Sequence, residues 1–186
     1  MTRVAVFGGS FNPPHVAHVL ACALVLSVED VDRVLVVPAY MHPFAKALAP
    51  FEDRAAMCDL AMAWMPRVDV SRVEAQLGGE SRTLRTLESL SSAHPDWRLR
   101  LVIGADILTE APRWFGFDVI EKIAPLIVLG RAGVAAPVAT AAILPEVSST
   151  QIRAAIARGA YSEVEKLVPR EVLAYARARG LYATPD

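Results

Sequence analysis

The sequence is poor in cysteine, which limits the kinds of fold and site that it can form. Only Cys22 and Cys58 are present, and both lie in apolar stretches without the close spacing of metal ligands. A secreted fold held together by disulfides is therefore disfavoured. We expect two buried free thiols, as in a protein of a reducing compartment.

The sequence also lacks an excess of charge of either sign. Its 19 Lys and Arg residues and 20 Asp and Glu residues give a formal net charge of −1. Because a protein that binds nucleic acid along a groove carries a clear basic excess, we expect no nucleic-acid partner. A mononucleotide needs only a local positive pocket, which this neutral balance permits.

No apolar run is long enough to cross a bilayer, so we expect no membrane association. The run at 19–28 lies near the N-terminus, but Gly, Asn and two Pro residues precede it. In a signal peptide, a charged start leads directly into the apolar core. We therefore interpret this run as a buried helix of a cytoplasmic protein.

Short and long apolar segments alternate along the chain. Short segments that are apolar throughout predict buried strands, and strands that alternate with helices indicate parallel βαβ units covered on both faces. We predict an α/β fold with a Rossmann-like, doubly wound parallel sheet, formed as a single domain over residues 1–186. The predicted strands are 4–7, 34–37, 68–73, 99–103 and 126–129, and the predicted helices are 14–27, 52–65, 83–93 and 117–123.

The last part of the chain has a different character. After a connector rich in Val and Ala at 132–142, we predict helices at 150–158 and 170–179. Pro169 lies just before the second of these helices and Gly180 just after it, as is typical of helix ends. Residues 147–186 are therefore expected to form a small helical C-terminal appendage to the sheet.

The first candidate site follows the first predicted strand and runs from Gly8 to His18. Glycines after a strand let the backbone approach a phosphate and present its N–H groups. His15 and His18 are three residues apart, so they share a face of the first helical turn. A helix N-terminus favours anions, and two imidazoles there could stabilise charge on a phosphorus centre. The alternative, a zinc site, lacks further ligands at suitable spacing.

The second candidate site is the segment from Val147 to Arg153. Ser148, Ser149 and Thr150 stand at the start of a predicted helix, and Arg153 lies one turn later. Hydroxyl groups, the helix dipole and a guanidinium could together hold a polyphosphate. The alternative is an ordinary helix start, in which one hydroxyl caps the helix and nothing binds.

Taken together, these two segments resemble the two signatures of the nucleotidyltransferase superfamily, the T/HxGH string and the Ser-Ser/Thr-x-x-Arg string. Over nearly its whole length the sequence is similar to the bacterial nicotinate-nucleotide adenylyltransferases. Further stretches that carry this resemblance are Ile103 to Asp106 with Trp114, Gly130-Arg131, and Leu167-Val168-Pro169 through Tyr175 to Gly180-Leu181-Tyr182.

The resemblance implies the transfer of an adenylyl group from ATP to nicotinate mononucleotide, which gives nicotinate adenine dinucleotide and pyrophosphate in NAD biosynthesis. His15, His18 and Arg153 would be catalytic, and Mg²⁺ would arrive with ATP, with no metal site of the protein's own. It also allows a homo-oligomer. The implied ATP-binding residues are Gly8, Gly9, Ser10, Phe11, His15, His18, Gly104, Asp106, Arg131, Ser148, Ser149, Thr150 and Arg153, and the implied substrate-binding residues are Asn12, Lys46, Arg82, Thr83 and Trp114.

Several of these residues have structural alternatives. Trp114 could belong to the core, Asp106 could cap a helix, and Lys46 could be a solvated loop charge. Two positions also depart from the family's pattern, because Ala17 replaces a glycine and Arg82 stands where many relatives carry tyrosine. We expect Ala17 to cost a little space near the adenine, and Arg82 to bear on substrate choice.

Two other functions share some of these features. Pantetheine-phosphate adenylyltransferases carry both signatures but lack the Leu-Val-Pro…Gly-Leu-Tyr ending seen here. A catalytically silent nucleotide-binding regulator would not need the intact pair of histidines or Arg153. A pyrophosphate-release assay with several acceptors separates these functions from the implied one.

Overall fold

A parallel β-sheet forms the centre of the protein. The computed structural model describes residues 1–41, 48–131 and 143–183. Within these residues the sheet has six strands in the order β3-β2-β1-β4-β5-β6, all parallel, as predicted for a doubly wound fold. The strands are β1 (Thr2–Gly9), β2 (Arg33–Pro38), β3 (Val68–Val70), β4 (Trp97–Gly104), β5 (Leu126–Arg131) and β6 (Ile143–Leu144).

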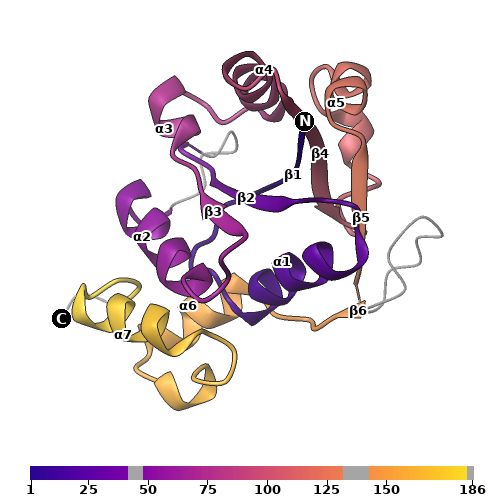
Figure 1. Cartoon of the computed structure of the whole chain (residues 1–186). Coiled ribbons are helices and arrows are strands. Elements are labelled where there is room, and N and C mark those ends of the chain that lie inside the picture. Colours follow the sequence, from indigo (N-terminus) through magenta and orange to yellow (C-terminus); the bar gives the residue numbers. More distant parts are fainter. Residues whose placement is uncertain (42–47, 132–142, 184–186) are drawn as a thin grey trace.

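Helices cover both faces of the sheet (Figure 1). Successive strand residues point to opposite faces, so Val34 and Val36 belong to one apolar cluster while Leu35 and Val37 belong to the other. The first cluster includes side chains of α1 (Val16–Val28), α2 (Phe51–Met62), α6 (Ser149–Ala157) and α7 (Arg170–Ala178). The second includes side chains of α3 (Val73–Leu77), α4 (Thr83–Ala93) and α5 (Phe117–Ile123). Short 3₁₀ turns lie at Ala111–Arg113 and Tyr161–Glu163.

The strand order reverses between β1 and β4, which lie side by side at the centre of the sheet. β1 pairs with β2 on one edge and with β4 on the other. The chain leaves β1 for β2 in one direction and later returns for β4 and β5 in the other. Loops that follow β1 and β4 therefore diverge at this point and leave a crevice beyond their carboxyl ends.

Two predicted elements end three residues earlier in the structure than predicted. The predicted strand at 68–73 ends at Val70, because the Ser71 hydroxyl accepts the N–H of Val73 at 3.2 Å and turns the chain into α3. Helix α2 ends at Met62, so Trp64 lies beyond it and is 67% exposed. The predicted helix at 52–65 is therefore wrong in its last three residues. The buried face of α2 includes Ala55, Met57, Cys58, Ala61 and Met62.

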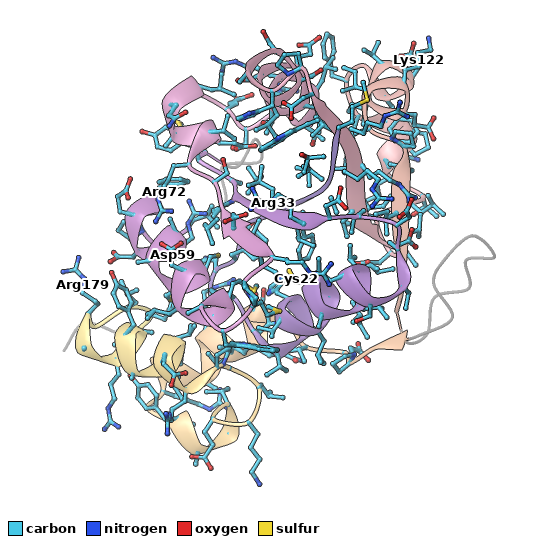
Figure 2. The ribbon with its side chains drawn as sticks, viewed as in Figure 1. Cys22, Arg33, Asp59, Arg72, Lys122 and Arg179 are labelled. Carbon is cyan, nitrogen blue, oxygen red and sulfur yellow. The ribbon has the colours of Figure 1, made fainter. Side chains whose placement is uncertain are left out.

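The apolar run at 19–28 forms most of α1, as predicted, but only one side of this helix is buried. Ala21, Cys22 and Val25 face the sheet, whereas Leu20 and Val28 are exposed. Cys22 and Cys58 are both free and buried. Figure 2 labels Cys22 on α1. Burial disfavours the thiolate and raises the pKa of Cys22 to about 12. Among the described helices, none has both the length and the apolar character that crossing a membrane requires.

The C-terminal helices are held against the body of the protein by polar contacts as well as by the core. Helix α7 packs beside α2, and Val172 and Ala176 join the apolar cluster of that face. Asp53 of α2 is almost fully buried and accepts hydrogen bonds from the Tyr175 hydroxyl at 2.8 Å and from Nε of Arg179 at 3.1 Å. The C-terminal appendage is therefore fixed in place relative to α2.

Candidate active site

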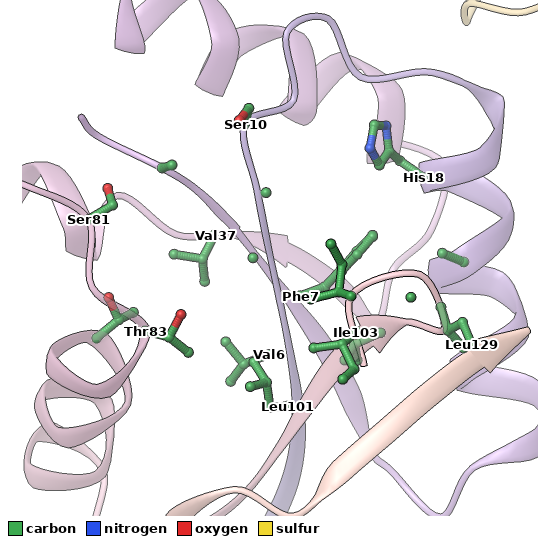
Figure 3. A pocket seen from close by; sticks show the side chains of 18 of the residues that line it. Val6, Phe7, Ser10, His18, Val37, Ser81, Thr83, Leu101, Ile103 and Leu129 are labelled. Atoms are coloured by element: carbon green, nitrogen blue, oxygen red, sulfur yellow. The ribbon is translucent and has the colours of Figure 1, made fainter. Parts of the chain in front are cut away.

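A cavity of about 780 Å³ opens beyond the carboxyl ends of β1 and β4, where the strand order reverses. It is lined by residues of the loop after β1, the start of α1, the start of α4, and the segments after β4 and before α6 (Figure 3). Predicted site residues in this lining are Gly8, Gly9, Ser10, His15, His18, Arg82, Thr83, Gly104, Asp106 and Trp114. Ala17 lies there too.

The loop after β1 is shaped by Phe11, whose ring folds back beneath it. Phe11 has a φ of 45°, which is uncommon for a residue with a side chain, and its ring is only 1% exposed. A Cβ at Gly9 would lie 3.1 Å from this ring, whereas a Cβ at Gly8 would meet nothing within 4 Å. Gly9 thus makes room for Phe11, and Gly8 leaves the cavity open. The structure places Phe11 in the core beneath the predicted phosphate loop and outside the lining of the cavity.

His15 and His18 lie together at the N-terminus of α1. Their rings stack with centroids 3.7 Å apart, and the backbone N–H of His15 donates to Nδ1 of His18 at 3.1 Å. Since Nδ1 of His18 accepts this bond, a neutral His18 carries its proton on Nε2. Phe11 contacts the His18 ring edge-on, with centroids 4.9 Å apart. The His18 ring projects from α1 toward the loop that carries Ser10 (Figure 3).

The start of α6 is tied to the same loop. The Ser149 hydroxyl donates to the carbonyl of Pro13 at 3.1 Å, and Nη1 of Arg153 donates to the carbonyl of Asn12 at 2.8 Å. Nη2 of Arg153 also contacts the Thr150 hydroxyl at 3.2 Å. The two predicted signatures, more than 130 residues apart in sequence, therefore meet, as their joint assignment to one site requires.

Ser148 stands at the N-cap of α6 but makes no side-chain cap hydrogen bond. The structure therefore does not show the ordinary capping arrangement at this residue. Just before it, Pro145 and Val147 line the cavity. The N-terminus of α6, with its unsatisfied backbone N–H groups and partial positive charge, accordingly lies at the rim of the cavity.

The opposite wall is formed by the start of α4 and the segment after β4. Arg82 is the N-cap of α4, and its guanidinium pairs with Glu80 at 2.8 Å, with both side chains about half exposed. Thr83 opens the first helical turn. Trp114 lines the cavity and also packs against the second apolar cluster, so it serves the core as well as the wall.

Gly104 and Asp106 form a tight turn at the end of β4. A Cβ at Gly104 would lie only 2.4 Å from Oδ1 of Asp106, so the glycine is what allows the Asp106 side chain to fold back over the strand end. The main chain of Arg131 ends β5, where it pairs with Leu144. Lys46 lies outside the described residues.

Sequence reasoning missed two polar residues beside the cavity. Arg54 stands in a predicted helix with nothing nearby to mark it, but it is 1% exposed and donates to the carbonyls of Ala49, Ser10 and Tyr40 at 2.9, 2.9 and 3.3 Å. Burial lowers the pKa of this guanidinium. Glu74 lines the cavity and accepts hydrogen bonds from the Thr86 hydroxyl at 2.9 Å and the N–H of Tyr40 at 3.1 Å.

No signal in the local sequence identifies these two roles. Arg54 is buried because α2 lies against the loop that carries its carbonyl partners, and Glu74 enters the site because β3 ends earlier than predicted. Within the described ranges, no group of three or more His, Cys, Asp or Glu side chains comes together in a way that could hold a metal ion.

Known proteins are similar to this chain over nearly its whole length. Residues 6–155 match the cytidylyltransferase-like family. Proteins named "probable nicotinate-nucleotide adenylyltransferase" from Anaeromyxobacter dehalogenans and Myxococcus xanthus are 48% and 46% identical. Each comparison covers 97% of this chain, and 96% and 94% of the respective relative.

Solved structures with the same fold are also found. Plasmodium falciparum nicotinic acid mononucleotide adenylyltransferase complexed with NaAD has a TM-score of 0.84 at 16% identity, covering 98% of both chains. A Vibrio parahaemolyticus structure described as a nicotinate-nucleotide adenylyltransferase has a TM-score of 0.74 at 22% identity, covering 100% of this chain and 98% of that one. At these identities the likeness shows a shared fold.

Proposed function

The chain belongs to the nicotinate-nucleotide adenylyltransferases, within the cytidylyltransferase-like family, and from this premise we propose that it joins nicotinate mononucleotide to ATP. The products are nicotinate adenine dinucleotide and pyrophosphate. The observation that carries this proposal is the meeting of the two signature segments, through the hydrogen bonds of Ser149 and Arg153 to the loop at 12–13, beside one cavity.

In the proposed reaction, a phosphate oxygen of the mononucleotide attacks the α-phosphorus of ATP. A P–O bond forms there, and the bond from the α-phosphorus to the bridging oxygen of the β-phosphate breaks. The second pKa of a phosphate monoester is about 6, so the attacking group is largely a dianion at neutral pH and needs no strong general base. The protein then has two tasks, to align the reacting groups and to stabilise the developing charge.

His15 and His18 suit the second task. Both line the cavity at the N-terminus of α1, and a neutral His18 has its N–H on Nε2 because Nδ1 is occupied. A donor that is already oriented costs little reorganisation when charge develops on the α-phosphate oxygens. We assign the two histidines to that phosphate, with the N–H groups of the Gly8–Ser10 loop beside them.

Arg153 and the start of α6 suit the leaving group. A guanidinium and a helix N-terminus both favour the negative charge that builds up on departing pyrophosphate. Arg153 is held by the Asn12 carbonyl and by Thr150, which fixes its position before any substrate binds. Mg²⁺ belongs to the substrate and is carried by the triphosphate.

The wall formed by Arg82, Thr83 and Trp114 suits the pyridine ring and its carboxylate. Trp114 offers an aromatic face, and the first turn of α4 offers backbone N–H donors and a partial positive charge. Gly104 and Asp106 suit the adenosine of ATP.

We also propose that the protein works in the cytoplasm, since both buried thiols are free.

A pyrophosphate-release assay tests this function directly. Purified protein with Mg²⁺ and ATP is given nicotinate mononucleotide, nicotinamide mononucleotide or phosphopantetheine as the acceptor. We expect release with nicotinate mononucleotide and formation of the dinucleotide in equal amount. Release only with phosphopantetheine would assign the chain to the other adenylyltransferase, and nucleotide binding without release for any acceptor would make it a regulator.

A further inference from the structure

Tyr182 reaches from the C-terminal end of the described chain to the phosphate-side loop of the site. Its hydroxyl donates to Oδ1 of Asn12 at 2.8 Å, across 170 residues of sequence. Beyond α7, the N–H of Leu181 bonds to the carbonyl of Ala176, and Gly180 adopts a φ of 62°, so the chain turns back sharply. Tyr182 itself has a φ of 65°, which persists for a non-glycine residue only where its surroundings fix it.

Asn12 joins separate segments of the chain. It is 2% exposed, and its Oδ1 also accepts the N–H of Ala49 at 3.1 Å. Its backbone carbonyl accepts Nη1 of Arg153. Asn12 therefore links the loop after β1 to the residues before α2, to α6 and to the C-terminal segment.

The orientation of Asn12 depends on the two hydrogen bonds to its Oδ1. The N–H of Ala49 can only donate, so the amide must present its oxygen there. Nδ2 of Asn12 is buried and has no hydrogen-bond partner within the described part of the chain. A buried donor without a partner is costly, so this amide would gain from turning toward another acceptor. Such a turn would break the hydrogen bond from the Tyr182 hydroxyl, so this bond holds the amide in place.

The phenol of Tyr182 is a reliable donor. Burial raises the pKa of Tyr182, so the hydroxyl keeps its proton throughout the physiological range. The charges of Arg153 and Arg54 lower the pKa of the same phenol, but burial is the larger effect.

We propose that Tyr182 is a positioning residue for the triphosphate side of the site, acting through Asn12 on the placement of Arg153. This inference rests on the proposed function only for its kinetic readout. Without the Tyr182 hydroxyl, only the N–H of Ala49 holds the side-chain amide of Asn12, and the carbonyl that orients Arg153 is held less firmly. The binding of pyrophosphate and the stabilisation of its charge in the transition state should then both weaken.

Tyr175 offers a matched control. It lies on α7, and its hydroxyl donates to Asp53 at 2.8 Å, the same length as the bond of Tyr182. Tyr175→Phe therefore removes one hydroxyl and one hydrogen bond between the C-terminal segment and the body, as Tyr182→Phe does, but leaves Asn12 untouched. A purely structural role of the C-terminal segment predicts the same kinetic effect for both variants.

The experiment compares the full chain with Tyr182→Phe and Tyr175→Phe, well below the melting temperature of the least stable protein. We measure kcat and the KM for ATP by pyrophosphate release, and the Kd of inorganic pyrophosphate by calorimetry. Tyr182→Phe should lower kcat and weaken pyrophosphate binding, each by about five- to tenfold, the scale of one neutral hydrogen bond. Tyr175→Phe should change each by less than about twofold.

A second comparison uses Arg153→Ala as the background. If Tyr182 acts through Arg153, adding Tyr182→Phe there should change kcat by less than about twofold. Equal losses in the two Tyr variants, an unchanged Tyr182→Phe, or a full further loss in the Arg153→Ala background would each overturn the proposal. An inactive wild-type protein whose pyrophosphate binding still responds to Tyr182→Phe would count against the proposed function and leave this inference standing.

Discussion

The imidazole of His18 stacks on that of His15 with 3.7 Å between centroids, and its Nδ1 accepts the backbone N–H of His15, so the His18 ring is held in place at the start of α1. Replacing either histidine by Ala should lower kcat by roughly 10²–10³-fold, because one oriented donor to the α-phosphate is lost. The KM for ATP should change much less. Steady-state pyrophosphate release measures both.

His94→Ala is the control for these two variants. His94 follows α4 and stacks on Trp97 with centroids 3.7 Å apart, and it is not among the residues that line the cavity. This variant should keep wild-type kcat. Near-normal turnover in His15→Ala or His18→Ala would remove that histidine from the mechanism.

Arg153→Ala should reduce transition-state stabilisation by about 2–4 kcal/mol, since it removes a charged donor to the departing pyrophosphate. Arg153→Lys should restore only part of kcat/KM, because Lys lacks the planar fork that bonds the Asn12 carbonyl and Thr150 together. Arg158→Ala, at the other end of α6, removes a surface pair with Glu163 and should leave kcat/KM unchanged. Full rescue by Lys would show that charge alone matters.

Nicotinate mononucleotide should be preferred over the amide by at least about tenfold in kcat/KM, which corresponds to about 1.4 kcal/mol. The Arg82 guanidinium is paired with Glu80 and half exposed, so the N–H groups at the start of α4 are the better candidates to recognise the carboxylate. We therefore expect Arg82→Ala to change the preference by less than about twofold. Arg85→Ala, whose guanidinium bonds the carbonyls of Leu77 and Gly78, is the matched control.

A clear loss of acid preference in Arg82→Ala, without the same loss in Arg85→Ala, would show that Arg82 contacts the carboxylate despite its pairing with Glu80. A wild-type preference for the amide would show that the pyridine pocket is not the one proposed.

Gly104→Ala should raise the KM for ATP, because a Cβ there would lie 2.4 Å from Oδ1 of Asp106 and force that side chain away from the end of β4. If displacement of Asp106 is the cause, then Asp106→Ala and the Gly104→Ala, Asp106→Ala double variant should have the same KM. A double variant worse than Asp106→Ala alone would instead locate the damage in the backbone of the turn.

The protein should also lose a pH-dependent part of its stability in acid. Side-chain and backbone hydrogen bonds from Arg3 lower the pKa of Asp32 to about 2. Between the ordinary pKa of about 4 and about 2, the unfolded state binds the extra proton, so the free energy of unfolding falls as the pH falls through this window. Urea titrations from pH 5 to pH 2 should show a shallower fall in Arg3→Gln. Arg98→Gln, on the adjacent strand, should retain the wild-type slope.

Much of the architecture follows from local sequence. Apolar runs of strand length alternate with longer amphipathic segments, and this pattern alone predicts parallel strands covered on both faces. Strand β1 with its glycine turn, the start of α1 with His15 and His18, and the start of α6 all lie where the sequence places them. These features depend on residues close to one another in the chain, so local rules of helix start, turn and strand apply.

Tertiary structure decided the contacts that hold the site together. Phe11 lies beneath its loop and not in the cavity, Arg54 is buried under Ser10, and Tyr182 bonds to Asn12. The partners of Arg54 and Tyr182 come from distant segments, so no local pattern marks them. From sequence alone, an arginine in a helix is expected to be exposed to solvent. Arg54 is buried only because α2 packs against the loop at residue 10, and burial of this kind depends on the assembled core and not on the local segment.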